Sequence, residues 1–372
     1  MNHALICVDN LRVGGYQRLA LDEAYALSDR GYIVSIFVLE ESNFSTTKIN
    51  TFFDIESGLI SSKNIEINFS SQSWLRLLVD LRHTINSIPK SPLIISHSLR
   101  CTAMLKLFKL FYLKRQMTIN TKIHQLPSLT DPKQRLKRLI YSQFTDYLFG
   151  FSEAVRVAWA TQFGNQIHLL LQFTKKIDLL RNGIYLDRLP VRDKLSLSSN
   201  SRPRIIFLGR LTFWKGLSIF ETISLLDELK DYDFLFIIPS YVDSDFWKLK
   251  AVLGDRLKIV EGRSINQLQF YEGDVHLYPA LYGKNSKVIE SISLNCLEMA
   301  CLGIPSLVTV GGQITWPEQV FKKVFLEVDW DSIDQVVSEV GRASNLKIQN
   351  EDLELIRRKI DINSELDRLI RK

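Results

Sequence analysis

Apolar and polar residues at the start of the chain follow the order of a strand, a glycine turn, a helix and a second strand. Residues 3–8 form a short apolar run, residues 11–16 hold the turn, residues 17–30 have the spacing of an amphipathic helix, and residues 31–38 are apolar and β-branched. Such a unit opens a doubly wound parallel sheet. The pattern therefore predicts an α/β fold.

A second series of apolar runs follows a polar stretch in the middle of the chain. Residues 188–203 are rich in serine and lack periodicity, which is typical of a linker. Beyond it we expect a strand at 204–209, a helix at 217–230 and strands at 232–239, 257–260 and 275–278. The pattern predicts an N-terminal domain at 1–187, this linker, and a C-terminal domain at 204–355.

Residues 288–310 combine two carboxylates with a predicted helix and strand. Asn295 and, three residues later, Glu298 have the spacing of a helix start, and Gly303 followed by a proline ends that helix. The apolar run after Gly303 is typical of a central parallel strand. Ligands collect at the carboxyl ends of such strands, near free helix N-termini. Glu290 and Glu298 bracket one of these ends.

The composition narrows the class of protein. A chain of 372 residues has room for two domains, and its 46% hydrophobic and 24% charged residues are typical of a globular protein. No apolar run has the length of a membrane-spanning helix, and the N-terminus lacks the basic residues of a secretory signal. The four cysteines have no metal-ligand spacing, so we expect buried, reduced thiols in a cytoplasmic protein.

Glycines and cations follow two of the predicted strands. Gly14 and Gly15 precede the first helix, where the backbone can approach a diphosphate; a tight turn between strand and helix explains the pair equally well. Arg210 and Lys215 follow the first strand of the second domain. Their charges suit a diphosphate, to which arginine can donate two hydrogen bonds. A solvated loop is the alternative for these two residues.

Two histidines lie near the ends of predicted strands. His97 follows the apolar run 93–95, and His124 lies in a second run, 121–127. The ends of parallel strands meet at one edge of a sheet, so both histidines are expected to point towards a cleft. A structural role is the alternative for each.

The segment 99–138 is the most basic part of the chain, although the net charge is only +6. Leucines and aromatic residues interleave with its first basic residues. A helix of this kind can lie on an anionic membrane surface, where each basic residue contributes about 1 kcal/mol. The alternative is a helix that packs its apolar face on the sheet and leaves a solvated basic rim. No nucleic-acid-binding module accompanies the charge, so we expect no nucleic-acid partner.

Five short motifs occur in a fixed order along the chain. They are Gly14-Gly15, His124, Asn182-Gly183-Ile184, Gly209-Arg210 with Lys215-Gly216, and Glu290 with seven residues before Glu298. In this order they resemble the retaining glycosyltransferases of the GT-B fold, the group that includes glycogen synthases and bacterial mannosyltransferases. The resemblance spans nearly the whole chain. It implies two Rossmann-like domains facing each other across a cleft, with a terminal helix at 356–372 packed back on the first domain.

The resemblance also implies a role for each matched residue. Arg210 and Lys215 would neutralise the diphosphate of a nucleotide-sugar donor. Glu290 would bind the sugar hydroxyls and Glu298 the ribose hydroxyls, while His124 would lie near the donor sugar and the acceptor. The implied catalytic residues are Glu290, His124, Lys215 and Arg210, and the implied donor-binding residues are Gly14, Gly15, Arg210, Lys215, Glu290, Ser291, Ser293, Leu294 and Glu298. His97 has no such match and remains a core or acceptor-side residue.

The implied reaction moves a sugar from a UDP- or GDP-sugar to a glycan or lipid-linked acceptor with retention of anomeric configuration, in the synthesis of a cell-surface polysaccharide such as lipopolysaccharide. The implied location is the cytoplasm, peripherally at the inner face of the cell membrane; the oligomeric state is left open. Cations and helix N-termini would stabilise the departing nucleoside diphosphate, so neither a metal nor a cofactor is expected. The chain departs from the family where Ser291 and Ser293 replace common glycines.

Other functions fit part of the pattern. Glu298 could serve only as the capping partner of Asn295, and Arg210 and Lys215 could lie in a solvated loop. The chain would then be an inactive GT-B protein or a binding subunit. Nucleotide-sugar 2-epimerases share the fold and bind the same ligands. Transfer to an acceptor distinguishes the transferase from both.

Overall fold

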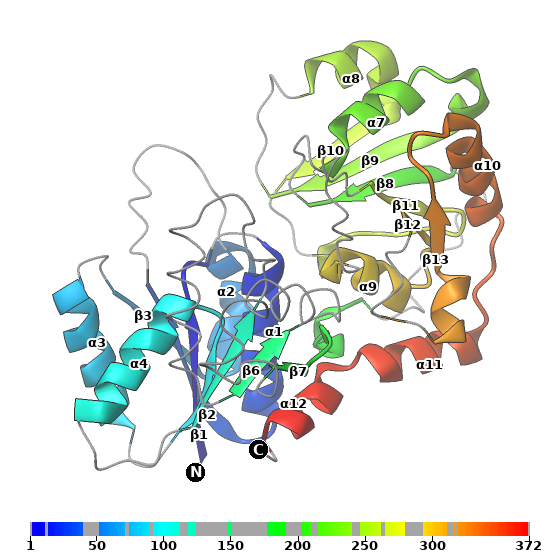
Figure 1. The fold of residues 1–372 in the computed structure, drawn as a ribbon. Helices are drawn as coiled ribbons and strands as arrows, with labels where there is room; N and C mark the ends of the chain where they lie inside the picture. The colour runs from blue at the N-terminus through cyan, green and yellow to red at the C-terminus, as the bar shows by residue number, and fades with distance from the viewer. Residues whose placement is uncertain are drawn as a thin grey trace, which may run out of the picture. The chain divides into compact units, whose positions relative to one another are not determined.

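The chain divides into two compact units in the computed structural model (Figure 1). The first comprises Met1–Thr47, Thr51–Tyr185 and Ile362–Lys372, and the second comprises Lys48–Asn50 and Leu186–Asp361. The structure describes residues 2–11, 14–39, 52–70, 74–88, 92–111, 118–123, 147–150, 177–190, 202–209, 215–239, 246–261, 265–279, 293–310, 316 and 318–370.

The first unit contains a seven-stranded parallel sheet with the order β3-β2-β1-β4-β5-β6-β7. The chain therefore adds strands on one side of β1 and then returns to add strands on the other, as the doubly wound prediction requires. The strands are β1 Asn2–Val8, β2 Tyr32–Val38, β3 Ile65–Phe69, β4 Leu93–Ser96, β5 Thr118–Ile123, β6 Tyr147–Gly150 and β7 Ile177–Leu179.

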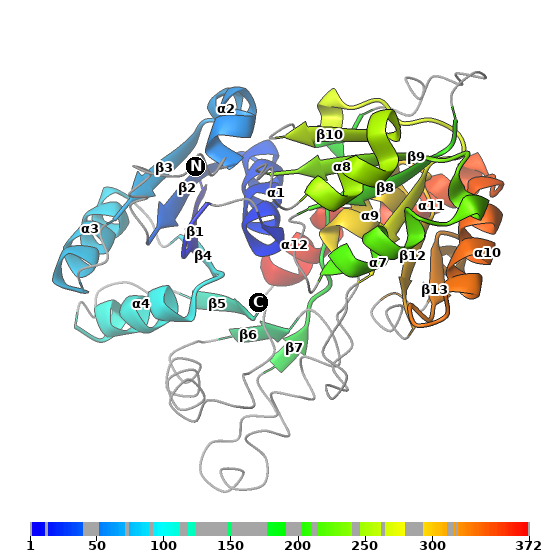
Figure 2. The same ribbon diagram turned by 90° about the horizontal axis from the view of Figure 1, so that it is seen from above.

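Helices cover both faces of this sheet (Figure 2). They include α1 Gly15–Asp29, α2 Phe52–Ser62, α3 Trp74–Ser87, α4 Leu99–Phe111 and α12 Ile362–Ile370. Alternate residues of β1 serve the two faces: Leu5 and Cys7 pack with α3 and α4, whereas Ala4 and Ile6 face α1. Both pairs are fully buried, which explains the uninterrupted apolar run of this strand.

The helix α4 packs the start of the basic segment onto the sheet. Four of its apolar residues belong to the buried cluster with α3, namely Cys101, Met104, Leu105 and Phe108. Lys106 and Lys109 are half-buried at the rim of this cluster. The apolar residues of α4 thus serve the core, as in the alternative considered for this segment; residues 112–117 and 124–138 lie outside the described part.

The second unit contains a six-stranded parallel sheet with the order β10-β9-β8-β11-β12-β13. Its strands are β8 Arg204–Leu208, β9 Asp233–Ile238, β10 Leu257–Glu261, β11 Val275–Tyr278, β12 Ser306–Thr309 and β13 Phe325–Val328. The two units therefore repeat one topology, and the prediction of two Rossmann-like domains is confirmed.

The second sheet is also covered on both faces. Its helices include α7 Leu217–Ile223, α8 Trp247–Leu253, α9 Leu294–Cys301, α10 Ile333–Ser344 and α11 Asn350–Ile360. Phe207, Phe220 and Phe236 pack edge to face in the apolar cluster that α7, α8 and α10 cover. The opposite face carries α9, with α11 packed against it.

Some predicted boundaries are wrong. The helix predicted at 217–230 ends at Ile223, since Leu226 is extended and a short 3-10 turn then carries Leu229 into the core. The terminal helical segment breaks at Asp361, whose φ of −54° and ψ of 122° separate α11 from α12. The strand predicted at 121–127 corresponds to β5, which begins earlier, at Thr118; residues 124–127 lie outside the described part.

The four cysteines, Cys7, Cys101, Cys296 and Cys301, are all free and buried, as predicted. Across the described ranges, no helix is both long enough and apolar enough to cross a bilayer.

Candidate functional site

Each sheet has a point at which the direction of strand addition reverses. It lies between β1 and β4 in the first unit and between β8 and β11 in the second. In open parallel sheets a ligand-binding crevice forms at the carboxyl ends of such a strand pair. In the second unit, the candidate residues within the described part gather around these ends of β8 and β11.

Two glycines flank residues 210–214, which include Arg210 and lie outside the described part. Gly209 follows β8 with a φ of +130°, and a Cβ added there would lie 3.0 Å from the Asn295 side-chain nitrogen. Gly216 starts α7 with a φ of +81°, and an added Cβ would lie 2.3 Å from Cγ of Pro279, directly after β11. Both positions need glycine because of backbone conformation and space. The motif Gly209-Arg210 with Lys215-Gly216 thus joins the ends of β8 and β11.

Lys215 lies at the carboxyl end of β11. Its Nζ donates a hydrogen bond to the hydroxyl of Tyr278, the last residue of that strand, and lies 4.5 Å from the centroid of the ring. The aromatic face and the hydroxyl together hold the ammonium at this edge of the sheet. The structure therefore places a predicted diphosphate-binding cation at the switch point.

The helix α9 begins at the same edge, but not as predicted. Its N-cap is Ser293, whose Oγ accepts a hydrogen bond from the main-chain N of Cys296 at 3.4 Å. Asn295 instead donates its side-chain amide to the main-chain oxygen of Leu208 at 2.5 Å. The predicted capping pair of Asn295 and Glu298 is wrong, because tertiary contacts take both side chains. The contact to Leu208 ties the N-terminal turn of α9 to the end of β8.

The end of α9 follows the prediction. Gly303 has a φ of +72°, and the N–H of Ile304 donates to the oxygen of Met299 at 2.9 Å. This is the hydrogen-bonding of a glycine-terminated helix.

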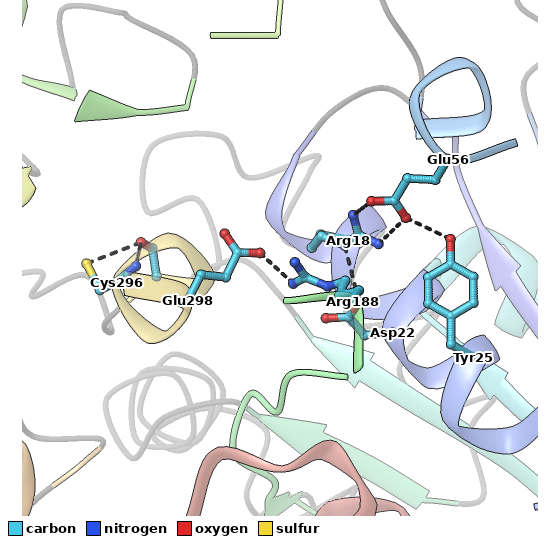
Figure 3. Close-up of polar contacts among 8 residues, drawn as sticks. Arg18, Asp22, Tyr25, Glu56, Arg188, Cys296 and Glu298 are labelled. Carbon is cyan, nitrogen blue, oxygen red and sulfur yellow. Dashed lines mark hydrogen bonds and ion pairs between the residues drawn. The ribbon is translucent and has the colours of Figure 1, made fainter. Parts of the chain in front are cut away.

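Glu298 lies in the second turn of α9 and forms a buried ion pair. Nη2 of Arg188 lies 2.5 Å from its Oε1, and the two side chains are only 1% and 6% exposed, in that order. Figure 3 shows the second carboxylate oxygen of Glu298 pointing away from the guanidinium. A guanidinium partner offsets part of the cost of burying such a carboxylate.

Sequence reasoning missed Arg188. The residue ends a 3-10 turn, Leu186–Arg188, at the start of the stretch predicted as a linker, and its partner lies 110 positions later in the chain. A single arginine before a serine-rich stretch carries no local signal of burial. Only the tertiary fold pairs it with Glu298.

The first unit carries its own group of candidates at its switch point. Gly14 is the N-cap of α1 in an extended conformation, and the helix has no side-chain cap. A Cβ added at Gly15 would meet no atom within 4 Å. Among the described residues, therefore, none crowds position 15.

His97 belongs to a buried charge cluster just beyond β4. Its Nε2 lies 2.9 Å from Oε2 of Glu23 on α1, and Lys122 near the end of β5 donates to the other oxygen of that carboxylate. Burial by itself raises the pKa of Glu23, but Lys122 and His97 outweigh it and lower the pKa below its usual value. His97 is thus a core residue of this cluster, one of the two roles considered for it.

A second buried cluster lies at the start of α1 (Figure 3). Arg18 donates two hydrogen bonds to Glu56, the longer at 2.6 Å, and also lies 3.2 Å from Asp22. Tyr25 donates to the same Glu56 carboxylate at 2.7 Å. These polar residues were not among the predicted site residues; they tie α1 to α2.

Comparison with known proteins shows the fold. No protein-family model matches the sequence, and no curated protein matches it. Among solved structures, Anabaena HepE in complex with UDP and glucose is similar over 100% of this chain and 99% of its own, at 13% identity and a TM-score of 0.70.

Two further structures agree. Sucrose-phosphate synthase from Thermosynechococcus elongatus is 14% identical, with 100% of this chain and 98% of its own covered and a TM-score of 0.66. The lipopolysaccharide outer core galactosyltransferase WaaB is 14% identical, with 100% and 99% covered and a TM-score of 0.60. The chain has the GT-B fold.

Four of the predicted site residues of this GT-B chain lie outside the described residues: His124, Arg210, Glu290 and Ser291. Of the others, Lys215, Ser293, Leu294 and Glu298 belong to the second unit, and Gly14, Gly15 and His97 to the first. No group of three or more metal-ligating side chains occurs within the described ranges.

Proposed function

We propose that this GT-B chain is a retaining glycosyltransferase that moves a sugar from a nucleotide-diphosphate donor to a glycan or lipid-linked acceptor. One observation carries the proposal: Lys215 lies at the end of β11, and the N-terminal turn of α9 is tied to the end of β8. These two strands form the switch point of the second sheet, and α9 is the helix that carries Glu298. HepE, which is similar in fold, was solved with UDP and with UDP-glucose.

The residue types suit the departure of a nucleoside diphosphate. Breaking the bond between the anomeric carbon and the phosphate oxygen leaves negative charge on the diphosphate. Lys215 and Arg210 neutralise this charge, and the main-chain N–H groups of Ser291, Ser293 and Leu294 supply hydrogen-bond donors. In the proposal these groups remove the need for a metal or cofactor.

In this proposal the two glutamates bind different parts of the donor. Glu290 binds the hydroxyls of the transferred sugar, and Glu298 binds those of the ribose. Gly14 and Gly15 let the backbone of the first unit approach the donor phosphates, and His124, which follows β5 in the sequence, lies near the donor sugar and the acceptor. The departing phosphate takes the proton of the acceptor hydroxyl on the face that it leaves, so configuration is retained.

A test of the transferase proposal uses donors labelled with ¹³C at the anomeric carbon, such as UDP-glucose and GDP-mannose, with a bacterial lipid extract as acceptor. We expect release of the nucleoside diphosphate and a product carbon with the configuration of the donor. Lys215→Ala is expected to lower the rate on the order of 10²-fold, because a fixed charge is lost at the leaving group. Lys230→Ala, on an exposed turn, is the matched control.

Three outcomes count against the proposal. Inverted configuration contradicts retention. Interconversion of the donor without an acceptor identifies an epimerase, and no turnover of any donor leaves a binding protein of the same fold.

We further propose that the acceptor belongs to a cell-surface polysaccharide assembled at the inner face of the membrane. The fold is shared with WaaB, and α4 carries a half-buried basic rim with Lys106 and Lys109. Replacing both lysines with serine is expected to reduce co-sedimentation with phosphatidylglycerol vesicles. Unchanged sedimentation removes the membrane part of the proposal.

A further inference from the structure

The Arg188–Glu298 ion pair is not explained by the stability of α9. The N-cap of this helix is supplied by Ser293, and its N-terminal turn is tied to β8 by Asn295. Taking two charges out of water costs several kcal/mol per ion. A pair of apolar residues of similar volume often gives a protein equal or greater stability than a buried ion pair. The buried carboxylate of Glu298, in the helix that begins beside β8, is therefore a candidate for a role in binding.

The pair leaves one carboxylate oxygen available. Nη2 of Arg188 takes Oε1 of Glu298, and among the described residues no donor reaches Oε2. The 6% exposure of the Glu298 side chain shows that the carboxylate is not completely sealed. Because Oε1 is held by a charge-assisted bond, the orientation of Oε2 is set by the guanidinium.

Arg188 is itself held in place. It ends the turn Leu186–Arg188, which is closed by a hydrogen bond of 2.9 Å from the N–H of Leu189 to the oxygen of Leu186. The side chains of Arg188 and Leu189 are both buried. The turn thus holds the main chain at Arg188, and Glu298 holds its guanidinium.

We propose that Arg188 is a positioning residue that acts through Glu298 on the ribose of a nucleoside diphosphate. By holding Oε1, it directs Oε2 to accept a hydrogen bond from a ribose hydroxyl. This inference rests on the proposed function, since it requires a ribonucleotide at the second-unit switch point.

The test compares nucleotides that differ only in the ribose. UDP, GDP and ADP are each titrated calorimetrically into the full chain beside their 2′-deoxy counterparts. The wild type is expected to bind one ribonucleotide about ten-fold or more tightly than its 2′-deoxy form, as for the loss of one hydrogen bond to a charged group. In Arg188→Met the ratio is expected to fall to about two-fold or less, while the affinity for the deoxy form stays within about two-fold.

Two further variants keep the result interpretable. Glu298→Gln is expected to lose the ratio as well, and adding Arg188→Met to it is expected to change the ratio no further, because Arg188 acts through that carboxylate. Arg188→Lys is the alternative variant if Arg188→Met does not fold, because a lysine keeps a positive charge beside Glu298. Its ammonium lacks the planar fork, so the ratio is expected to fall at least about three-fold.

The outcomes separate the inference from the proposed function. The positioning role is overturned if Arg188→Met or Arg188→Lys keeps the wild-type ratio of ribonucleotide to 2′-deoxynucleotide affinity. It is also overturned if the variant loses affinity equally for both forms. Either result leaves the transferase proposal intact. Failure of the wild type to bind any of the three nucleotides overturns both.

Discussion

Gly216 lies at a point where two requirements coincide. Its φ of +81° suits glycine, and its Cα faces Pro279 at the end of β11, so that a Cβ would overlap the ring. Neither requirement involves a ligand. The position of Lys215 beside Tyr278 nevertheless depends on both, because Lys215 is the residue just before this glycine.

Gly216→Ala is expected to destabilise the chain by roughly 2–4 kcal/mol, since strain at positive φ and overpacking against Pro279 add together. Chemical denaturation followed by circular dichroism measures the change. Gly31→Ala is the matched control, because Gly31 also has a positive φ, of +78°, but among the described residues an added Cβ meets no atom within 4 Å. Equal losses in the two variants would show that Pro279 contributes nothing.

His276 is a buried residue of β11 with only one of its ring nitrogens engaged. Nδ1 lies 3.0 Å from Oγ of Ser306, and within the described residues Nε2 has no hydrogen-bond partner. Burial lowers the pKa of His276 to about 3. The folded chain therefore holds this imidazole neutral at pH values where the unfolded chain, with a histidine pKa of about 6.5, is protonated.

The depressed pKa predicts an acid-sensitive contribution to stability. The contribution is complete above pH ~6.5 and declines as pH falls towards the folded pKa, by about 1.4 kcal/mol per unit. Between pH 7.5 and pH 5 the wild type is expected to lose about 2 kcal/mol more than His276→Asn, which keeps a polar group near Ser306 without a titrating ring. Urea denaturation at each pH gives the difference; parallel pH curves for the two proteins would contradict it.

Single-residue patterns located the site only in part. Gly209 ends a predicted strand, Lys215 precedes a predicted helix, and Glu298 lies within one, so local patterns were enough to select these three as candidates. The pairing of Asn295 with Glu298 failed because their side chains reach Leu208 and Arg188 instead, over long stretches of sequence. Local spacing contains no information about such partners.

At the scale of elements, the motif Asn182-Gly183-Ile184 has a structural explanation within the first unit. A Cβ added at Gly183 would lie 2.6 Å from Cα of Ile362, the first residue of α12. The N–H of Ile362 donates to the oxygen of Ile184 at 3.0 Å. The motif is thus the surface on which α12 begins.

The same helix is held at a second point. Arg30, after α1, donates to the side-chain and main-chain oxygens of Asn363 at 3.0 and 2.7 Å and lies 2.9 Å from Asp367. The terminal helix therefore closes the first unit through contacts at both Gly183 and Arg30.

Gly183→Ala is expected to displace the start of α12, because the new methyl group meets backbone rather than a flexible side chain. We expect a loss of roughly 1–3 kcal/mol, typical of overpacking, and faster proteolysis near residue 361. Gly58→Ala on the open surface of α2 is the control and is expected to be neutral or slightly stabilising. If Gly183→Ala is cleaved at the same rate as the wild type, α12 does not rest on this glycine.

Strands that are buried along their length could be predicted from the sequence, whereas helix ends that depend on tertiary packing could not. The apolar runs within β1 and β9 identify strands buried on both faces. The end of α7 at Ile223 and the break at Asp361 depend instead on where Leu229 and Ile362 must pack. Neither break carries a proline or glycine to mark it in the sequence.

At the scale of the whole molecule, one topology occurs twice and each copy has polar residues at its reversal point. The first has the cluster of Glu23, His97 and Lys122, and the second has Lys215 with the Arg188–Glu298 pair. The repeated strand-glycine-helix pattern was sufficient to predict both sheets. The identity of the sugar depends on pocket shape, where small contact changes alter discrimination by only ~1–3 kcal/mol, and no motif encodes it.

The central claim is that the second unit binds the diphosphate of a nucleotide sugar with Lys215. It is tested most directly by thermal unfolding of the wild type and Lys215→Ala with UDP-, GDP-, ADP- and CMP-sugars. Ligand at one hundred times its dissociation constant adds about 2.7 kcal/mol of stability, so the wild type is expected to gain a few degrees with one nucleotide. Lys215→Ala should lose most of that gain. An equal shift in both proteins, or none with any nucleotide, would contradict the account.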